Sequence, residues 1–123
     1  MDNEYSTAAF GRRARDVFQR NNENPQFVFL SLNAPHSPVL APPEEREKFR
    51  QMFPTESDSR IELLAAIRAV DNEMKKLVEI VNGLDRETLI IFQSDNGGRT
   101  FSHKGRKLQE SCNFPYKETE SQR

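Results

Sequence analysis

The amino-acid sequence predicts an α/β fold with a βαβ core, in which helices connect two parallel strands. Two near-continuous apolar runs, residues 27–32 and 88–92, have the composition of strands that are buried on both faces of a sheet. Between them, residues 60–81 show the spacing of an amphipathic helix. Such a crossover places both strands parallel, with their carboxyl ends at the same edge of the sheet.

Three helices are expected from the periodicity of the chain. The first spans residues 7–20 and ends at a polar segment that contains Pro25. The second is a short charged helix at residues 44–53, which follows Pro43 and carries acidic residues near its positive end. The third spans residues 60–81 and ends at Asn82-Gly83. Its apolar positions recur every three or four residues: Leu63, Ile67, Val70, Met74, Leu77 and Val81.

Composition excludes several kinds of partner. The 123 residues carry a formal net charge of -1 with both signs interspersed, so no basic face is offered to nucleic acid or anionic lipid. No stretch approaches the ~20 apolar residues of a membrane span, and the acidic N-terminus does not have the pattern of a signal peptide. A single cysteine, Cys112, rules out an intramolecular disulfide. We therefore expect neither a nucleic acid nor a membrane as a partner.

The candidate site residues follow the two predicted strands. His36 lies in a proline-rich loop after the first strand, and Asp95 and Asn96 directly follow the second. Ligands of open α/β sheets bind beyond the carboxyl ends of strands, so we expect these residues to converge. Carboxylate and amide oxygens suit calcium or magnesium, and an imidazole can donate a proton or bind an anion. The alternatives are a strand-ending Asp-Asn-Gly turn and a solvated loop histidine.

Lys107 is a further candidate. Its ammonium group could contact an oxyanion, whereas the alternative is a solvated basic run, because residues 104–107 contain three basic side chains.

Two motifs carry a resemblance to a known family. Ala-Pro-His-x-Pro at residues 34–38 and Ser-Asp-Asn-Gly-Gly at residues 94–98, each after an apolar run, resemble the arylsulfatase B-like branch of the type I sulfatases. The resemblance covers residues 4–107, which we interpret as a partial sulfatase catalytic domain, and the polar residues 108–123 are expected to be a disordered tail. It implies an incomplete alkaline-phosphatase-like fold, hydrolysis of a sulfate ester or a sulfated glycan, calcium as cofactor, and a lysosomal or secreted location.

The resemblance also implies a role for each candidate residue. Asp95 and Asn96 would be two calcium ligands, His36 would contact the sulfate or protonate the leaving oxygen, and Lys107 would hold a sulfate oxygen. The family forms its formylglycine nucleophile from a cysteine in Cys-x-Pro-x-Arg, and this motif does not occur in the sequence, where Cys112 has different neighbours. The family's other aspartate pair would precede residue 1. We therefore expect no activity from this chain alone.

Two other functions stay open. One is a non-catalytic sulfatase-like module that binds a sulfated glycan or a protein partner. The other is a hydrolase of phosphate esters, which is disfavoured because both motifs match sulfatases in residues and in layout.

Overall fold

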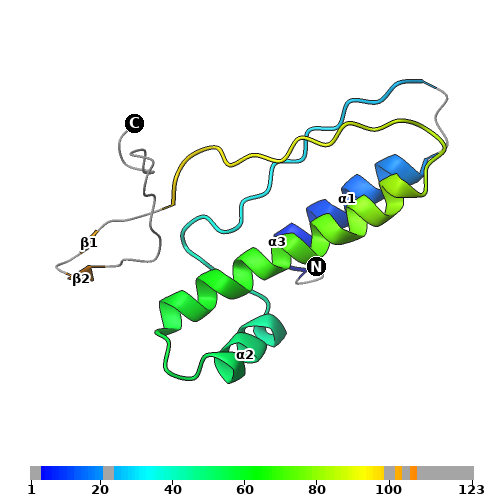
Figure 1. The fold of residues 1–123 in the computed structure, drawn as a ribbon. Helices are drawn as coiled ribbons and strands as arrows, with labels where there is room; N and C mark the ends of the chain where they lie inside the picture. Colours follow the sequence, from blue (N-terminus) through cyan, green and yellow to red (C-terminus); the bar gives the residue numbers. More distant parts are fainter. Residues whose placement is uncertain (1–3, 21–23, 99–101, 104–105, 108–123) are drawn as a thin grey trace. The chain divides into compact units, whose positions relative to one another are not determined.

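A computed structural model describes residues 4–20, 24–98, 102–103 and 106–107 of the chain. Its regular structure comprises three helices and a pair of short strands (Figure 1). The helices are α1 (Ser6–Gln19), α2 (Pro43–Met52) and α3 (Asp58–Asn82), and the strands are β1 (Ser102–His103) and β2 (Arg106–Lys107), which pair antiparallel. The chain divides into two compact units, Met1–Thr88 and Leu89–Arg123, and all three helices belong to the first.

The three predicted helices are confirmed, each within two residues of the expected bounds at either end. At the start of α2, Pro43 occupies the first helical turn together with Glu44 and Glu45, as expected from its fixed φ and from the helix dipole. The Ser57 side chain caps α3 by accepting a hydrogen bond from the Arg60 N–H. Both α1 and α2 pack against α3 (Figure 1).

Small residues are buried in both α1 and α3. Ala14 of α1 is buried, as are Ala65, Ala66 and Ala69 of α3. Gly11 lies so close to α3 that an added Cβ would come within 2.9 Å of the Glu73 Cβ. The close approach of α1 to α3 at this point therefore depends on the missing side chain of Gly11.

The buried face of α3 differs from the predicted apolar stripe. Only Leu77 and Val81 of that stripe are buried, and Ile67 is 47% exposed. The buried residues follow a neighbouring line of helical positions: Ile61, Ala65, Ala66, Ala69, Glu73, Leu77 and Val81. Within this line Glu73 contacts Gly11 and Arg15 of α1, so the line, and not the predicted stripe, includes the contact with α1.

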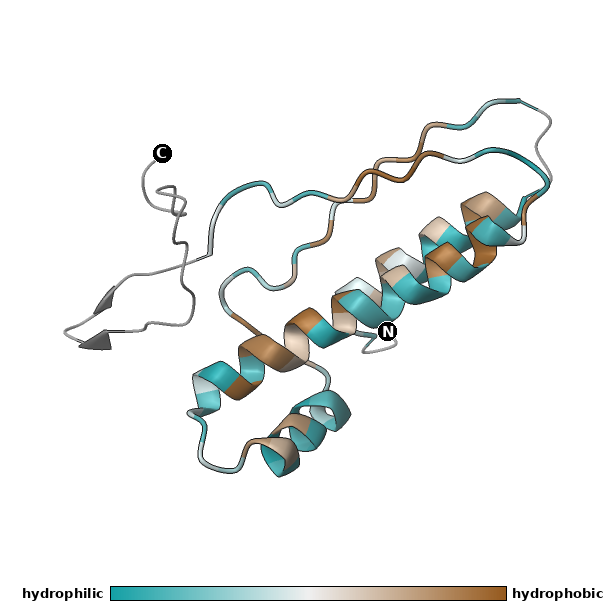
Figure 2. Cartoon of the chain, viewed as in Figure 1, coloured by the Kyte–Doolittle hydropathy of each residue, from teal (hydrophilic) through white to brown (hydrophobic). Residues whose placement is uncertain are grey.

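The predicted α/β fold is wrong. Neither residues 27–32 nor residues 88–92 form a strand, and the described part of the chain contains no βαβ unit and no sheet of the alkaline-phosphatase-like kind. The two runs, brown in Figure 2, expose their apolar side chains, with Phe27 at 91% and Leu89 at 84%. Composition gives only a propensity for a strand, because a strand forms when a neighbouring backbone supplies its hydrogen bonds. Within the described residues neither run is paired as a strand, so the regular structure is mainly helical.

No helix that the structure describes combines the length and the apolar character needed to cross a bilayer.

Candidate functional site

His36 lies in the loop between the first apolar run and α2, and its side chain is exposed. Its backbone N–H donates a hydrogen bond of 2.8 Å to the Asn33 carbonyl, which closes a turn. The ring Nδ1 lies 2.6 Å from the Ser37 carbonyl oxygen. Because a carbonyl can only accept, Nδ1 carries the proton in this contact.

Two hydrogen bonds attach the end of this loop to the helical unit. The Tyr5 hydroxyl, at the start of α1, donates to the Leu40 carbonyl at 2.8 Å. The Ala41 N–H donates to Glu62 Oε1 of α3 at 2.7 Å. Sequence reasoning missed this role of Tyr5 and Glu62, because the contacts join residues 35 and 21 positions apart and no local pattern reports them.

Asp95 and Asn96 lie at a bend in the second unit, where the Asp95 side chain is exposed and Asn96 is half-buried. The Ser94 hydroxyl donates a 2.5 Å hydrogen bond to the Asn96 carbonyl, which closes the turn. The donor types fit calcium, which prefers carboxylate and amide oxygens. Across the described ranges, no three His, Cys, Asp or Glu side chains are grouped to hold a metal ion. Calcium prefers ~6 to 8 oxygens, of which the side chains of Asp95 and Asn96 would supply two.

The candidate residues are distributed over both units. His36 belongs to the first unit, and Asp95, Asn96 and Lys107 belong to the second. The convergence of His36 with the other three therefore stays a prediction. Lys107 is part of β2, where its backbone pairs with that of Ser102. Cys112 and the predicted tail lie outside the described residues.

A buried carboxylate that sequence reasoning also missed lies between α1 and α3. Glu73 accepts a hydrogen bond from Arg15 of α1 and another, of 2.6 Å, from Lys76. Burial acts to raise the pKa of Glu73, but the hydrogen bonds from Lys76 and Arg15 outweigh it and hold the pKa below its ordinary value. A signal was present, because Glu73 continues the line of Ala69 and Leu77 at four-residue spacing. We interpret the cluster of Glu73, Arg15 and Lys76 as a structural contact that holds α1 against α3.

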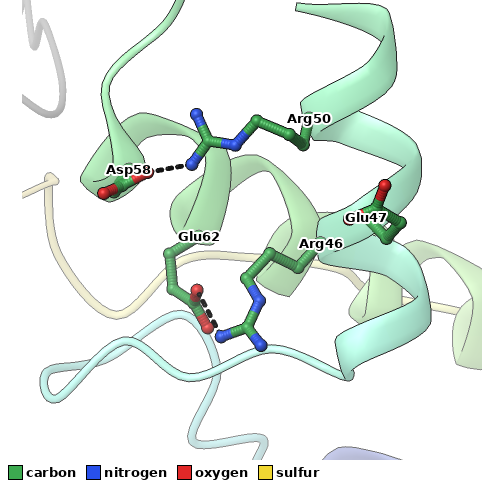
Figure 3. Close-up of a pocket in the computed structure, with 5 residues that line it drawn as sticks. All are labelled: Arg46, Glu47, Arg50, Asp58 and Glu62. Atoms are coloured by element: carbon green, nitrogen blue, oxygen red, sulfur yellow. Dashed lines mark hydrogen bonds and ion pairs between the residues drawn. The ribbon is translucent and has the colours of Figure 1, made fainter. Parts of the chain in front are cut away.

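A pocket between α2 and α3 has none of the candidate residues in its lining. Figure 3 shows Arg46 and Arg50 of α2 reaching towards Glu62 and Asp58 of α3. Arg46 pairs with Glu62 at 3.4 Å, and Arg50 pairs with Asp58. Both arginines are paired with carboxylates of α3 or its start, so we interpret these side chains as a connection between α2 and α3.

Comparison with known proteins identifies a family. The model of the sulfatase family matches residues 2–119, which include both motifs and all four candidate residues. An endo-4-O-sulfatase of Bacteroides thetaiotaomicron is 26% identical over 121 residues, which cover 79% of this chain and 24% of that protein. The chain thus spans about a quarter of the length of this curated relative. No solved structure gives a significant match. Because the family model covers nearly the whole sequence, the chain belongs to the sulfatase family.

Proposed function

We propose that the chain contributes part of a site that hydrolyses sulfate esters, with Asp95 and Asn96 as calcium ligands and His36 and Lys107 as groups that act on the sulfate. The observation that supports this most directly is the family match, which spans both the histidine loop and the Asp-Asn turn. A relative named as an endo-4-O-sulfatase supports a sulfate ester as the substrate class. The resemblance of both motifs to the arylsulfatase B-like branch favours an aryl sulfate or a sulfated glycan.

Each proposed residue has a defined chemical task. When bound, calcium would supply positive charge next to the sulfate oxygens. Asp95 and Asn96 would hold it through their carboxylate and amide oxygens. His36, whose Nδ1 is oriented by the Ser37 carbonyl, would donate a proton from Nε2 to the leaving oxygen. Lys107 would bind a sulfate oxygen through its ammonium group.

The nucleophile of this reaction would come from outside these residues. The sequence contains no Cys-x-Pro-x-Arg motif, and the segment around Cys112 does not match it. The site is therefore proposed as one half of an active centre. The chain by itself is expected to leave an aryl sulfate such as p-nitrophenyl sulfate unchanged, and turnover by the isolated chain would contradict this assignment of the nucleophile.

Calcium binding tests the proposed half-site directly. Titration of the full chain with calcium chloride in a calorimeter should give weak binding, with a Kd of about 10⁻³ M or weaker, because few ligands are present. Asp95→Ala should abolish the heat of binding. Asp85→Ala is the matched control, since Asp85 is also exposed but lies outside the motif. Equal binding by both variants, or none by the unmodified chain, would contradict the proposal.

A binding module without catalysis is the second candidate, favoured by the lack of the cysteine motif. In that case a sulfated oligosaccharide should bind the chain as tightly after Asp95→Ala and His36→Ala as before. Loss of binding in both variants would favour the half-site.

A further inference from the structure

The peptide unit between Leu40 and Ala41 has both of its polar groups bonded to side chains of the helical unit. The Tyr5 hydroxyl donates to its C=O at 2.8 Å, and its N–H donates to Glu62 Oε1 of α3 at 2.7 Å. This peptide is trans, and the C=O and N–H of a trans peptide point in opposite directions. Side chains from the start of α1 and from α3 therefore hold this anchored peptide from opposite sides.

The Glu62 carboxylate that accepts from the anchored peptide is itself held in place. Its Oε1 accepts from Ala41, and its Oε2 lies 3.4 Å from Arg46 Nη1 of α2. The Glu62 side chain is 17% exposed, whereas the Tyr5 contact is exposed to solvent. A hydrogen bond to a charged acceptor that is mostly buried is stronger than a neutral, exposed one. Of the two anchors, Glu62 therefore contributes more to holding the loop.

A short and stiff stretch connects the anchored peptide to His36. Three residues, Ser37, Pro38 and Val39, separate His36 from Leu40, and the ring of Pro38 fixes its φ. The imidazole is bonded to this same stretch, because its Nδ1 lies 2.6 Å from the Ser37 carbonyl oxygen. A shift of the anchored peptide would therefore move the backbone that orients the His36 ring.

We propose that Glu62 is a positioning residue for His36. By holding the anchored peptide from α3, the Glu62 carboxylate fixes the backbone to which the imidazole is bonded. The placement of the acceptor carries this role, because the bond from Ala41 needs an oxygen at hydrogen-bonding distance and not merely a negative charge near the loop. That the positioned ring acts on a sulfate ester rests on the proposed function.

Two conservative substitutions separate the placement of the acceptor from its charge. Glu62→Gln keeps the length of the side chain and an oxygen acceptor but removes the charge. Glu62→Asp keeps the charge and shortens the side chain by one methylene group. We expect Glu62→Gln to behave like the unmodified chain and Glu62→Asp to behave like Glu62→Ala. Glu79→Ala is the matched control, because Glu79 pairs with Lys75 several turns further along α3.

The readout is the tautomer of the His36 ring in nitrogen NMR spectra of the isotope-labelled full chain. At alkaline pH, where an imidazole is neutral, the unmodified chain should show one form with the proton on Nδ1. Glu62→Ala and Glu62→Asp should give a mixture of both tautomers, and Glu62→Gln should keep the Nδ1–H form. A residue that only stabilised the fold would leave the tautomer unchanged in a variant that stays folded, which helical circular dichroism checks.

Amide hydrogen exchange gives an independent measurement at the anchored peptide. The Ala41 amide should exchange about tenfold faster in Glu62→Ala and Glu62→Asp, because it loses a hydrogen bond to a charged acceptor. It should stay slow in Glu62→Gln and in Glu79→Ala. An unchanged His36 tautomer in Glu62→Ala and Glu62→Asp would overturn the proposal. Equal changes in Glu62→Gln and Glu62→Asp, or the same change in Glu79→Ala, would also overturn it.

Calcium titration of the same chain separates the positioning role from the proposed function. A His36 tautomer that depends on Glu62, in a chain that binds no calcium, would support the positioning role and count against the half-site. Calcium binding that Asp95→Ala abolishes, together with a tautomer that does not respond to Glu62, would leave the half-site standing and reject the positioning role.

Discussion

The Glu73 carboxylate of α3 pairs with the Arg15 guanidinium of α1 inside the interface of the two helices. The side chains are 6% and 18% exposed, respectively, and Lys76 completes the cluster from the next turn of α3. Gly11 makes room for the carboxylate, since a Cβ at this position would meet the Glu73 side chain. The packing of α1 on α3 therefore combines a small-residue contact with a buried ion pair.

Removal of Arg15 should destabilise the helical unit. Arg15→Met leaves the buried Glu73 carboxylate with Lys76 alone, and we expect the free energy of unfolding to fall by about 1–3 kcal/mol. Urea unfolding followed by circular dichroism measures this change. Arg13→Met is the control, because Arg13 is exposed on the same helix. Equal losses in the two variants would show that the ion pair is not what stabilises the interface.

The same cluster should make stability depend on pH. The pKa of Glu73 lies below its ordinary value of 4.5 in the folded protein, so the unfolded chain binds more protons near this pH. The stabilisation is fully present above pH 4.5 and is lost as the pH falls through the lower, folded-state pKa. Thermal unfolding at pH 7 and at pH 3 should therefore show a larger drop for the unmodified chain than for Glu73→Gln. Parallel curves for the two proteins would argue against a depressed pKa.

Substitution of Gly11 should disturb the helix contact despite the higher helix propensity of alanine. In Gly11→Ala the new methyl group meets the Glu73 side chain, and overpacking of this kind costs about 1–3 kcal/mol. Gly83→Ala is the matched control, since the nearest atom to its Cβ, the Ile80 carbonyl oxygen, lies 3.4 Å away. We expect the control to change stability by about 0.5 kcal/mol or less. A more stable Gly11→Ala protein would show that α1 lies farther from α3.

The helices could be predicted from sequence because their hydrogen bonds and periodicity are local. The spacing of apolar residues and the cap at Gly83 identified α3 almost to its ends. The choice of buried face was not local: it depends on which side of α3 accepts α1, and the close approach at Glu73 is made possible by Gly11 of α1. The stripe of large apolar side chains therefore predicted that α3 is a helix, but it did not predict which face of α3 packs against α1.

The predicted strands failed for the opposite reason. Phe27, Phe29 and Leu89 belong to runs with strong β propensity, but propensity alone does not make a strand, and within the described residues neither run is paired as one. The motifs around His36 and Asp95 pointed to the family because their residues and spacing are specific. The expected convergence of His36 with Asp95 rested on the predicted βαβ unit, which the structure does not contain, and so it stays a prediction.

Loss of the Tyr5 hydroxyl should loosen the histidine loop while leaving the helices intact. Tyr5→Phe removes the hydrogen bond to the Leu40 carbonyl, which is worth about 0.5–1.5 kcal/mol at most because the contact is exposed. Amide hydrogen exchange should become faster in residues 36–41 and stay unchanged in α3. Glu4→Gln provides the control, since it breaks the neighbouring exposed ion pair with Arg12 without touching the loop. Unchanged loop exchange in Tyr5→Phe would mean that the bond from Ala41 to Glu62 is sufficient to hold the loop that carries His36.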